Sequence, residues 1–472
     1  MAKPTGFLEI ERAYPHKRPV AERVTDFREI EELLNNGLIQ NQAARCMDCG
    51  IPFCHAYGCP VHNRIPDMNT LLFKKQWRKA LDLIHLTNNF PEITGRICPA
   101  LCEEACTLAV GFKSVSIRMI ELHLVERGFR EGWVLPQPAE VKSNKSVAVI
   151  GSGPAGLACA QQLARMGHRV VVFEETKKPG GLLRYGIPDF KLEKWIIDRR
   201  LEQMEKEGVV FENEVCAGRD LSVKYIQKTF DAVVIATGSR VPRDIQIEGR
   251  TLKGIHFALD FLSLQNRLLS GESADREETL SAKGKKVVVI GGGDTGADCV
   301  GTCRRQGATD IIQLEVLPKP PATRDPANPW PTWPTILRSG SSHEEGCERL
   351  WSIQVKSFEG HQNKVERIHC AKLEWVEENG RKVPKEIPNT GFILDANLAL
   401  LATGFIHPRN DELLKDMKIG LDERGNIRTD ANQMTSSSGV FSAGDCVRGA
   451  SLVVHAINQG RKTAEAVNAY LI

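Results

Sequence analysis

Residues 146–174 read SVAVIGSGPAGLACAQQLARMGHRVVVFE. A short apolar run is followed at once by Gly151-x-Gly153-x-x-Gly156, then by a helix-like stretch and a second apolar run that ends in Glu174. In such a unit the first glycine makes the turn, the second lets a pyrophosphate approach the backbone, and the third allows close helix packing. The terminal acid can accept a ribose hydroxyl. The stretch therefore predicts a dinucleotide-binding fold.

The same organisation returns about 140 residues later. Residues 287–315 contain Gly291-x-Gly293-x-x-Gly296 and end in Glu315. Each copy is followed by another apolar run that ends in Ala-Thr-Gly, at residues 236–238 and 402–404. This weak internal repeat predicts two related folds, one for tightly held FAD and one for exchanging NAD(P)H. The expected nucleotide contacts are Gly151, Gly153, Pro154, Ala155, Gly156, Glu174, Gly238, Gly291, Gly292, Gly293, Asp294, Thr295, Glu315 and Gly404.

Glu315 bears on the choice of nicotinamide nucleotide. A carboxylate there would accept the 2′-hydroxyl of NAD and repel the 2′-phosphate of NADP, which favours NADH. Three nearby cations, Arg304, Arg305 and Lys319, could instead bind that phosphate. We favour the simpler interpretation that these cations follow the end of a helix, where they complement the helix dipole.

A third motif lies near the C-terminal end, in residues 439–453 (GVFSAGDCVRGASLV). Asp445 could hydrogen-bond a ribityl hydroxyl of the flavin, or simply cap a helix. Ser451 opens a helix-like stretch whose start could stabilise negative charge on the reduced flavin ring. The preceding residue, Gly444, belongs to the same predicted turn.

Fourteen cysteines are many for a chain of 472 residues, and seven of them fall between residues 46 and 106. A dense thiol cluster in a reducing compartment indicates metal binding or redox chemistry rather than disulfides. Staggered thiolates suit two iron–sulfur clusters, which need four ligands each, although zinc or unligated thiols remain alternatives. Candidates for the eighth ligand are His55, His62 and Glu121. The seven cysteines are Cys46, Cys49, Cys54, Cys59, Cys98, Cys102 and Cys106.

Composition narrows the class of protein. The 62 basic and 59 acidic residues leave a formal charge of +3, which argues against a nucleic-acid binder and a polybasic membrane anchor. The N-terminal residues MAKPTGFLEIERAY lack an apolar signal core, and no uncharged stretch fits a membrane span. We therefore expect a cytoplasmic protein. We find no Cys-x-x-Cys dithiol beside the flavin motifs, no Ser-His-Asp signature, and no N-terminal cysteine for glutamine hydrolysis.

The chain divides into domains where the predicted secondary structure changes from helical to alternating strands and helices. Residues 1–143 lack strand patterning, and helices are expected at 26–34 and 67–86, so we predict an α-helical iron–sulfur domain. It precedes two nested Rossmann-like domains of α/β class. We expect the FAD-binding domain at 144–280 and 396–472, and the NAD(P)H-binding domain at 281–395. The proline-rich segment 318–334 contains Trp330 and Trp333, and is read as a rigid surface loop, a nicotinamide lid or a docking edge.

In this order, the cysteine-rich region and the motifs AVIGSGPAGL (148–157), GGLLRYGIPDFKL (180–192), GGGDTGADC (291–299) and GVFSAGD (439–445) resemble the small (beta) subunit family of glutamate synthase. The resemblance covers nearly the whole chain. Segment 318–334 is similar to the NADH-type enzymes. The same module recurs in dihydropyrimidine dehydrogenase and in flavin-based ferredoxin–NADP oxidoreductases.

The resemblance implies roles for individual residues. Cys46, Cys49, Cys54 and Cys106 would hold one [4Fe–4S] cluster. The second would be held by Cys59, Cys98 and Cys102, with Glu121 as an oxygen ligand. Flavin contacts would come from Gly181, Leu182, Lys191, Ser451, Leu452 and Val453. Glu315 is a departure, because NADPH-using relatives carry basic residues at this strand end.

The resemblance also implies a function. The chain would be an electron-input subunit that oxidises NAD(P)H at FAD and passes electrons through its clusters to a large (alpha) subunit. That partner would make glutamate from 2-oxoglutarate and glutamine-derived ammonia. No side chain of this chain is expected to be catalytic, because the cofactors perform the redox chemistry. Two alternatives stay open: a subunit of an NAD(P)H–ferredoxin or sulfide-linked flavin oxidoreductase, and a scaffold that has lost its cofactors.

Overall fold

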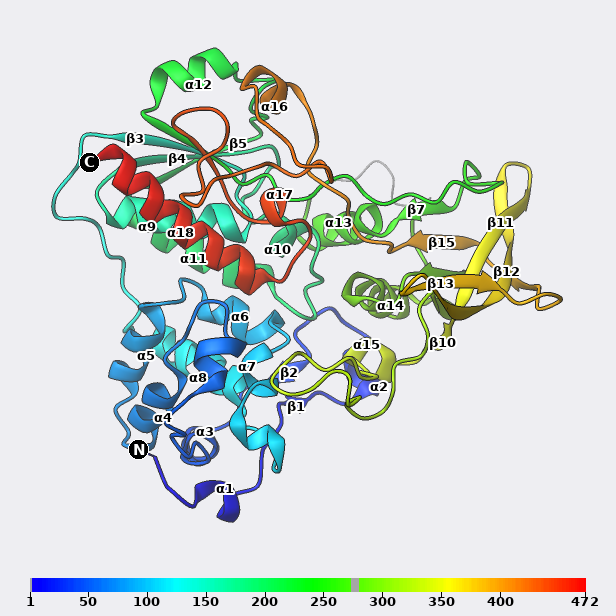
Figure 1. Ribbon diagram of the computed structural model, residues 1–472, viewed down its shortest axis with the longest axis horizontal. Helices are drawn as coiled ribbons and strands as arrows, with labels where there is room; N and C mark the ends of the chain where they lie inside the picture. The colour runs from blue at the N-terminus through cyan, green and yellow to red at the C-terminus, as the bar shows by residue number, and fades with distance from the viewer. Residues whose placement is uncertain (1, 273–279) are drawn as a thin grey trace.

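The computed structural model describes residues 2–272 and 280–472, and two parallel five-stranded sheets dominate it (Figure 1). The first sheet has the strand order β16-β6-β3-β4-β5. Its central strands are fully buried runs of Val, Ile and Ala, as expected for parallel strands covered on both faces. The strands are β3 (Ser146–Ile150), β4 (Arg169–Glu174), β5 (Val209–Asn213), β6 (Ala232–Ile235) and β16 (Val440–Ser442).

The second sheet repeats this arrangement in the order β7-β15-β8-β9-β10. In both sheets the strand before the glycine turn is central, and the strand that ends in the acid lies next to it. The prediction of two related α/β folds is confirmed. The strands are β7 (Ile255–Phe257), β8 (Lys286–Ile290), β9 (Asp310–Glu315), β10 (Glu348–Trp351) and β15 (Leu398–Leu401).

Sheet pairing differs from the expected domain division at two strands. β7 and β15 both lie in the second sheet, with β15 between β8 and β7. The predicted domain boundaries at 280/281 and 395/396 instead place both strands in the FAD-binding domain. Each is a short hydrophobic run that either sheet could accommodate, so only the pairing decides its place. The other boundaries stay predictions, and residues 273–279 lie outside the described residues.

Helices cover the faces of both sheets, and a separate antiparallel sheet projects from the second fold (Figure 1). The C-terminal helix α18 packs along α9, which begins at the first glycine turn. None of the described helices is long and apolar enough to cross a membrane. The antiparallel strands are β11 (Ile353–His361), β12 (Lys364–Glu378), β13 (Arg381–Glu386) and β14 (Phe392–Asp395). The helices are α9 (Pro154–Arg165), α10 (Leu182–Tyr185), α11 (Lys194–Lys206), α12 (Val223–Thr229), α13 (Ala258–Leu269), α14 (Asp294–Gln306), α15 (Ser341–Glu344), α16 (Glu412–Asp416), α17 (Asp445–Arg448) and α18 (Val453–Leu471).

The N-terminal region is built from short helices, apart from a two-residue ladder of β1 (His16–Lys17) and β2 (Glu31–Glu32). The helix expected at 67–86 is present as two helices separated at Lys74–Gln76, where Lys75 has a φ of +59°. The helices are α1 (Gly6–Glu9), α2 (Val20–Arg23), α3 (Asn36–Ala44), η1 (Cys54–Gly58), α4 (Ile65–Phe73), α5 (Trp77–His85), α6 (Pro91–Ile97), α7 (Leu101–Glu104), η2 (Thr107–Val110) and α8 (Ile117–Arg130).

The expected helix at 26–34 is wrong. This stretch is irregular apart from the two-residue strand β2, and two of its acidic side chains pair with arginines on other elements: Glu29 with Arg96 at 2.5 Å and Glu31 with Arg118 at 2.9 Å. A helix of nine residues is marginal on its own, so these long-range ion pairs and the β1–β2 ladder outweigh local propensity.

Candidate functional site

A cavity of about 530 Å³ lies where the two dinucleotide folds meet the N-terminal region. The first fold supplies most of the lining, and the second fold supplies residues of α14 together with Ser341. The N-terminal region supplies residues around the end of α6, Leu122 on α8, and Glu29, Ile30, Glu31 and Leu33. The sequence-predicted residues on its walls are Gly151, Gly153, Pro154, Ala155, Glu174, Gly181, Leu182, Lys191, Gly238, Asp294, Thr295, Gly444, Asp445, Ser451, Leu452 and Val453. The predicted nucleotide and flavin contacts that are not on its walls are Gly156, Gly291, Gly292, Gly293, Glu315 and Gly404.

The first glycine turn has the geometry of a phosphate cradle. Gly151 has a φ of +100°, and a Cβ there would lie 2.5 Å from the Ala236 carbonyl oxygen. A Cβ on Gly156 would lie 2.0 Å from the Gly151 carbonyl oxygen. By contrast, a Cβ on Gly153 would meet nothing within 4 Å, although this residue lines the cavity. The turn is therefore tight on its protein side and open on its cavity side, where a pyrophosphate fits at the start of α9.

Glu174 stands at the end of β4 and is buried. Its carboxylate accepts the backbone N–H of Ser152 at 3.1 Å and that of Thr176 at 2.9 Å, together with both hydroxyl groups. These donors hold the carboxylate against the glycine turn and leave it on the cavity wall. This is the position required of an acceptor for a ribose hydroxyl.

The second glycine turn repeats the first. Gly291 has a φ of +129°, and a Cβ there would lie 2.2 Å from the Ala402 carbonyl oxygen. Gly293 is open in the same way as Gly153. Glu315 accepts the N–H of Gly292 at 2.8 Å and the N–H of Leu317 at 2.9 Å, which are the equivalents of the two backbone donors to Glu174.

The C-terminal motif lines the cavity beside the first turn, where a Cβ on Gly444 would lie 2.8 Å from the Cβ of Ala155. The Ser451 hydroxyl donates to Asp445 Oδ1 at 2.7 Å, and burial raises the pKa of Asp445. The long helix α18 begins at Val453, two residues later than expected, and its first turn lies on the cavity wall. A helix N-terminus there places unpaired N–H groups and a partial positive charge on the cavity.

Lys191 links the cavity to the second fold. Its ammonium pairs with Asp298 on α14 at 2.5 Å. Burial alone would lower the pKa of Lys191, but the Asp298 carboxylate outweighs burial and the pKa is raised. Lys191 is therefore a fixed positive charge on the cavity wall.

The seven N-terminal cysteines fall into two groups. All are free thiols, and those whose pKa is shifted are raised chiefly by burial. Cys46, Cys49, Cys54 and Cys106 act on one another electrostatically. Cys59, Cys98 and Cys102 likewise act on one another electrostatically. Burial is the main cause that raises the pKa of Cys59 to about 12. These are the two sets that the resemblance implied.

Glu121 belongs to the second group. It is buried, its charge helps to raise the pKa of Cys59 and Cys102, and its own pKa is raised by burial to about 7. Asn63 donates to Glu121 Oε1 at 2.8 Å. His55 and His62 instead direct Nδ1 at backbone carbonyls. Among the described residues no three His, Cys, Asp or Glu side chains lie close enough to hold a single metal ion, and ligands of a four-iron cluster stand farther apart than those of one ion.

Comparison with known proteins identifies the family. The pyridine nucleotide-disulphide oxidoreductase model matches residues 145–460, and the dihydropyrimidine dehydrogenase domain II, 4Fe-4S cluster model matches residues 23–133. The "Glutamate synthase [NADPH] small chain" of Mycobacterium tuberculosis is 47% identical over 100% of this chain and 96% of its own length. The chain belongs to the glutamate synthase small-subunit family.

The names of other relatives of this chain give different nicotinamide nucleotides, either NADPH or NADH. The "Glutamate synthase [NADPH] small chain" of Bacillus subtilis is 41% identical over 100% of this chain and 99% of its own. "Glutamate synthase [NADH]" of Schizosaccharomyces pombe is 44% identical over 98% of this chain and 22% of its own length. FprA of M. tuberculosis, at 19% identity and a TM-score of 0.55 over 69% of this chain and 84% of its own, shares the fold. The small-subunit family member is thus an oxidoreductase with an FAD/NAD(P)H module and a 4Fe–4S domain.

The three cations near Glu315 differ in whether they are accessible to a nucleotide 2′-phosphate. The Arg305 guanidinium is fully buried, pairs with Glu345 at 2.6 Å and lies over the Phe190 ring. The Lys319 ammonium lies 5.1 Å from the centre of the Trp351 ring, and Arg304 is exposed. Arg305 therefore has a structural role, whereas Arg304 and Lys319 remain accessible.

Sequence reasoning missed the contribution of the N-terminal region to the cavity. Arg96, Ile97 and Pro99 flank Cys98 and line the cavity, as does Leu122 on α8. Pro99 was noticeable only as a neighbour of a cysteine. No local pattern marks these residues, because their role comes from contact between distant parts of the chain.

The proline-rich segment lies against the cysteine-rich region, and none of residues 318–334 lines the cavity. The Trp330 ring packs on Phe53 with centroids 4.7 Å apart, next to Cys54. Arg324 and Arg338 approach Glu104 at 3.8 and 3.5 Å. The interpretation as a loop with packed indoles fits these contacts better than that of a nicotinamide lid.

Proposed function

We propose that this chain is the electron-input subunit of a glutamate synthase. One observation supports this most strongly: a single cavity is bounded by the first glycine turn, by the start of α14, and by the residues on either side of Cys98. A flavin there would lie between a nicotinamide site and a cysteine group. This is the arrangement that transfer from a hydride donor to an iron–sulfur cluster requires.

Bound FAD would supply two-electron chemistry with NAD(P)H and one-electron chemistry with the clusters. The chain's own residues position and shield these groups. The first turn and α9 would bind the pyrophosphate, and Glu174 would accept a ribose hydroxyl. Lys191 and the start of α18 would favour negative charge on the reduced ring. The two cysteine groups would each bind a [4Fe–4S] cluster, the second with Glu121.

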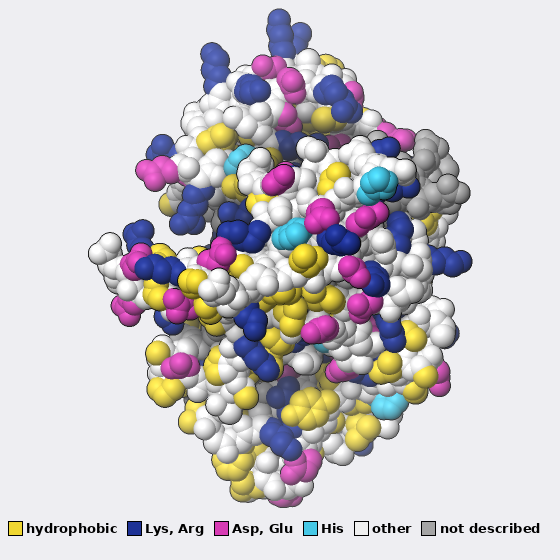
Figure 2. Space-filling model, turned by 90° about the vertical axis from the view of Figure 1, so that its right-hand side faces the viewer, with side chains coloured by type: hydrophobic (Ala, Val, Ile, Leu, Met, Phe, Trp, Pro, Cys, Tyr) yellow, Lys and Arg dark blue, Asp and Glu magenta, His cyan; other side chains and the backbone are white. Residues whose placement is uncertain are grey.

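We place the electron exit at the first cysteine group. The second group contains Cys98, which lies between two cavity-lining residues. Exposed hydrophobic side chains lie within six residues in sequence of cysteines of the first group: Ile51 is 73% exposed, Tyr57 55%, Val110 66% and Phe112 54%. In Figure 2, hydrophobic side chains are interspersed with charged ones over the lower half of the face, where the N-terminal region and the segment before α15 lie. Such a surface suits a large protein partner, in this proposal the glutamate synthase large subunit.

The geometry of Glu315 favours NADH. Two backbone donors orient its carboxylate as Glu174 is oriented, so it would accept a 2′-hydroxyl and repel a 2′-phosphate. Arg305 is buried in another ion pair and cannot offset that repulsion.

An anaerobic titration of the pure chain tests the proposal. Loss of flavin absorbance at near-stoichiometric NADH, followed by reduction of the clusters, is the expected result. The isolated chain should oxidise NADH only with artificial acceptors, and it should form glutamate only with a large subunit. A colourless, iron-free anaerobic preparation would contradict the proposal, as would glutamate formation by the chain alone. Isolation with a small flavin subunit would instead favour the ferredoxin- or sulfide-linked alternative.

A further inference from the structure

α6 connects the first dinucleotide fold to the second cysteine group. Its residues run from Pro91 to Ile97, directly before Cys98, and its last residues line the cavity. It packs against α8 on one side and approaches α18 on the other. The position of Cys98 relative to the cavity therefore depends on how α6 is held.

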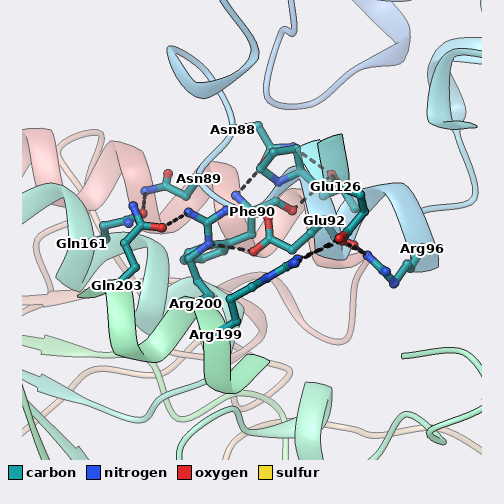
Figure 3. Close-up of polar contacts among 12 residues, drawn as sticks. Asn88, Asn89, Phe90, Glu92, Arg96, Glu126, Gln161, Arg199, Arg200 and Gln203 are labelled. Carbon is teal, nitrogen blue, oxygen red and sulfur yellow. Dashed lines mark hydrogen bonds and ion pairs between the residues drawn. The ribbon is translucent and has the colours of Figure 1, made fainter. Parts of the chain in front are cut away.

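The start of α6 is held by a fully buried ion pair. Glu92 on α6 is 0% exposed and Arg200 on α11 is 2% exposed. Arg200 Nε and Nη2 donate to the two carboxylate oxygens at 2.7 and 2.6 Å, and its Nη1 donates to Gln203 at 2.7 Å. Figure 3 shows this two-pronged contact between the helices. α11 belongs to the first fold, so the pair joins the N-terminal region to the fold that carries the cavity.

The end of α6 is held by a second ionic contact. Arg96 donates to Glu126 on α8 at 2.7 Å, and Arg199, the neighbour of Arg200 on α11, donates to both oxygens of Glu126 at 2.9 and 3.0 Å. The Arg96 guanidinium also pairs with Glu29. The same cluster is seen on the right of Figure 3. Both ends of α6 are thus tied, directly or through α8, to α11.

Stability alone does not explain charges at this junction. Removing two charges from water is costly, and a buried ion pair is often no more stabilising than apolar side chains of similar size. What a two-pronged Arg–carboxylate contact adds is direction, because both groups are planar and accept one alignment. A contact of this kind fixes the relative position of two helices more closely than apolar packing does.

We propose that Glu92 and Arg200 are positioning residues for electron transfer from the flavin to the cluster held by Cys59, Cys98 and Cys102. The inference rests on the proposed function. The pair and the Glu126 contact set the distance between Cys98 and the cavity. Nicotinamide binding and hydride transfer occur on the other side of the cavity, at α14, and do not cross this junction.

The test compares two rates in Arg200→Lys, which keeps the charge and loses the two-pronged contact. After anaerobic mixing with NADH, flavin absorbance reports hydride transfer, and the magnetic resonance signal of freeze-quenched samples reports cluster reduction. We expect flavin reduction within about twofold of the unaltered chain and cluster reduction slower by about tenfold or more, because small displacements strongly affect transfer steps. Amide hydrogen exchange across residues 91–98 should rise, and exchange across α14 should not.

A matched control is Arg23→Lys. Arg23 is 2% exposed and pairs with Glu345 at 2.8 Å, so it too joins the N-terminal region to a dinucleotide fold, but to the second fold and away from α6. This variant should leave cluster reduction unchanged. Glu126→Gln, at the other end of α6, should reproduce the Arg200→Lys result and serves where Arg200→Lys fails to fold.

Three results would overturn the inference. One is cluster reduction at the normal rate in a folded Arg200→Lys or Glu126→Gln chain. Another is equal slowing of flavin and cluster reduction. The third is equal slowing by Arg23→Lys, which would indicate general loosening. If NADH fails to reduce the clusters of the unaltered chain, the proposed function itself is wrong, so the two failures are distinguishable.

Discussion

Glu174 and Glu315 occupy equivalent positions in two folds that are expected to bind different nucleotides. Each ends the second strand of its fold and accepts a backbone N–H from the glycine turn and another from the residue two positions later. Only Glu174 is fully buried, whereas Glu315 is partly exposed. The same residue type at the same position thus suits a permanently held nucleotide in one fold and an exchanging one in the other.

Glu315→Gln tests the nucleotide preference. Removing the negative charge should raise kcat/KM for NADPH relative to NADH by about tenfold, equivalent to about 1.4 kcal/mol, because repulsion of the 2′-phosphate is relieved. Steady-state reduction of ferricyanide with each nucleotide measures the ratio. Glu374→Gln removes the same charge at an exposed site of the same fold and should leave the ratio unchanged. An unaltered ratio in Glu315→Gln would mean that other groups select the nucleotide.

Cys102→Ser tests the division of the cysteines. Loss of one ligand of the second group should remove about four of the eight iron atoms expected per chain and leave the other cluster intact. Iron analysis and the reduced-cluster magnetic resonance spectrum measure this. Cys347→Ser, at a half-buried thiol of the second fold, should retain all iron. Full iron content in Cys102→Ser would count against the proposed ligand set.

At the scale of elements, the glycine turns determine how α9 and α14 meet their sheets. Gly156 and Gly296 bring each helix so close that a Cβ would lie 2.0 and 2.2 Å from the carbonyl oxygen of the first glycine. Gly153 and Gly293 have no such neighbour. Within one motif, therefore, one glycine is needed by the fold and another leaves room for a ligand.

Gly153→Ala and Gly156→Ala form a matched pair. Gly153→Ala should fold with an unchanged melting temperature in the flavin-free state but bind FAD more weakly, since its Cβ points into free space on the cavity side. Gly156→Ala should lower the stability of the flavin-free chain by about 1–3 kcal/mol, because the helix must move away. Thermal unfolding and flavin titration separate the two effects. If Gly153→Ala bound FAD as tightly as the unaltered chain, the first glycine turn would not be the site that binds the pyrophosphate.

At the scale of the whole molecule, all three regions contribute residues to one cavity. Two of them also carry groups that do not line this cavity. The second fold carries the second glycine turn, and the N-terminal region carries the first cysteine group together with several exposed hydrophobic side chains. The proline-rich segment of the second fold contacts the N-terminal region, because its Trp330 ring packs on the ring of Phe53.

Tyr57→Lys combined with Phe112→Lys tests the exit surface. Charges on this surface should weaken association with a co-expressed large subunit by about tenfold or more and lower glutamate formation in parallel, because apolar anchors dominate such interfaces. Ferricyanide reduction by the isolated chain should persist. Tyr225→Lys, equally exposed on α12 of the first fold, is the control. Normal assembly of the double variant would place the large subunit elsewhere.

Local sequence determined the two dinucleotide folds, because glycine turns, buried strands and terminal acids interact within about 30 residues of one another. It also located the cysteines, whose division into two ligand sets follows from family resemblance and stays a prediction. It failed at residues 26–34, where a helical pattern is overridden by ion pairs from Glu29 and Glu31 to distant arginines.

Tertiary structure alone decided what lies around the flavin site and how the regions join. The approach of Ile97 and Pro99 to the cavity, the Glu92–Arg200 pair and the sheet membership of β7 and β15 all join segments far apart in the chain. In sequence Arg305 could be a phosphate ligand or a cation at a helix end, and only the structure shows its guanidinium buried against Glu345. Sequence patterns report each segment's own preferences, whereas these contacts depend on which distant side chains can be buried together and satisfy one another's charges.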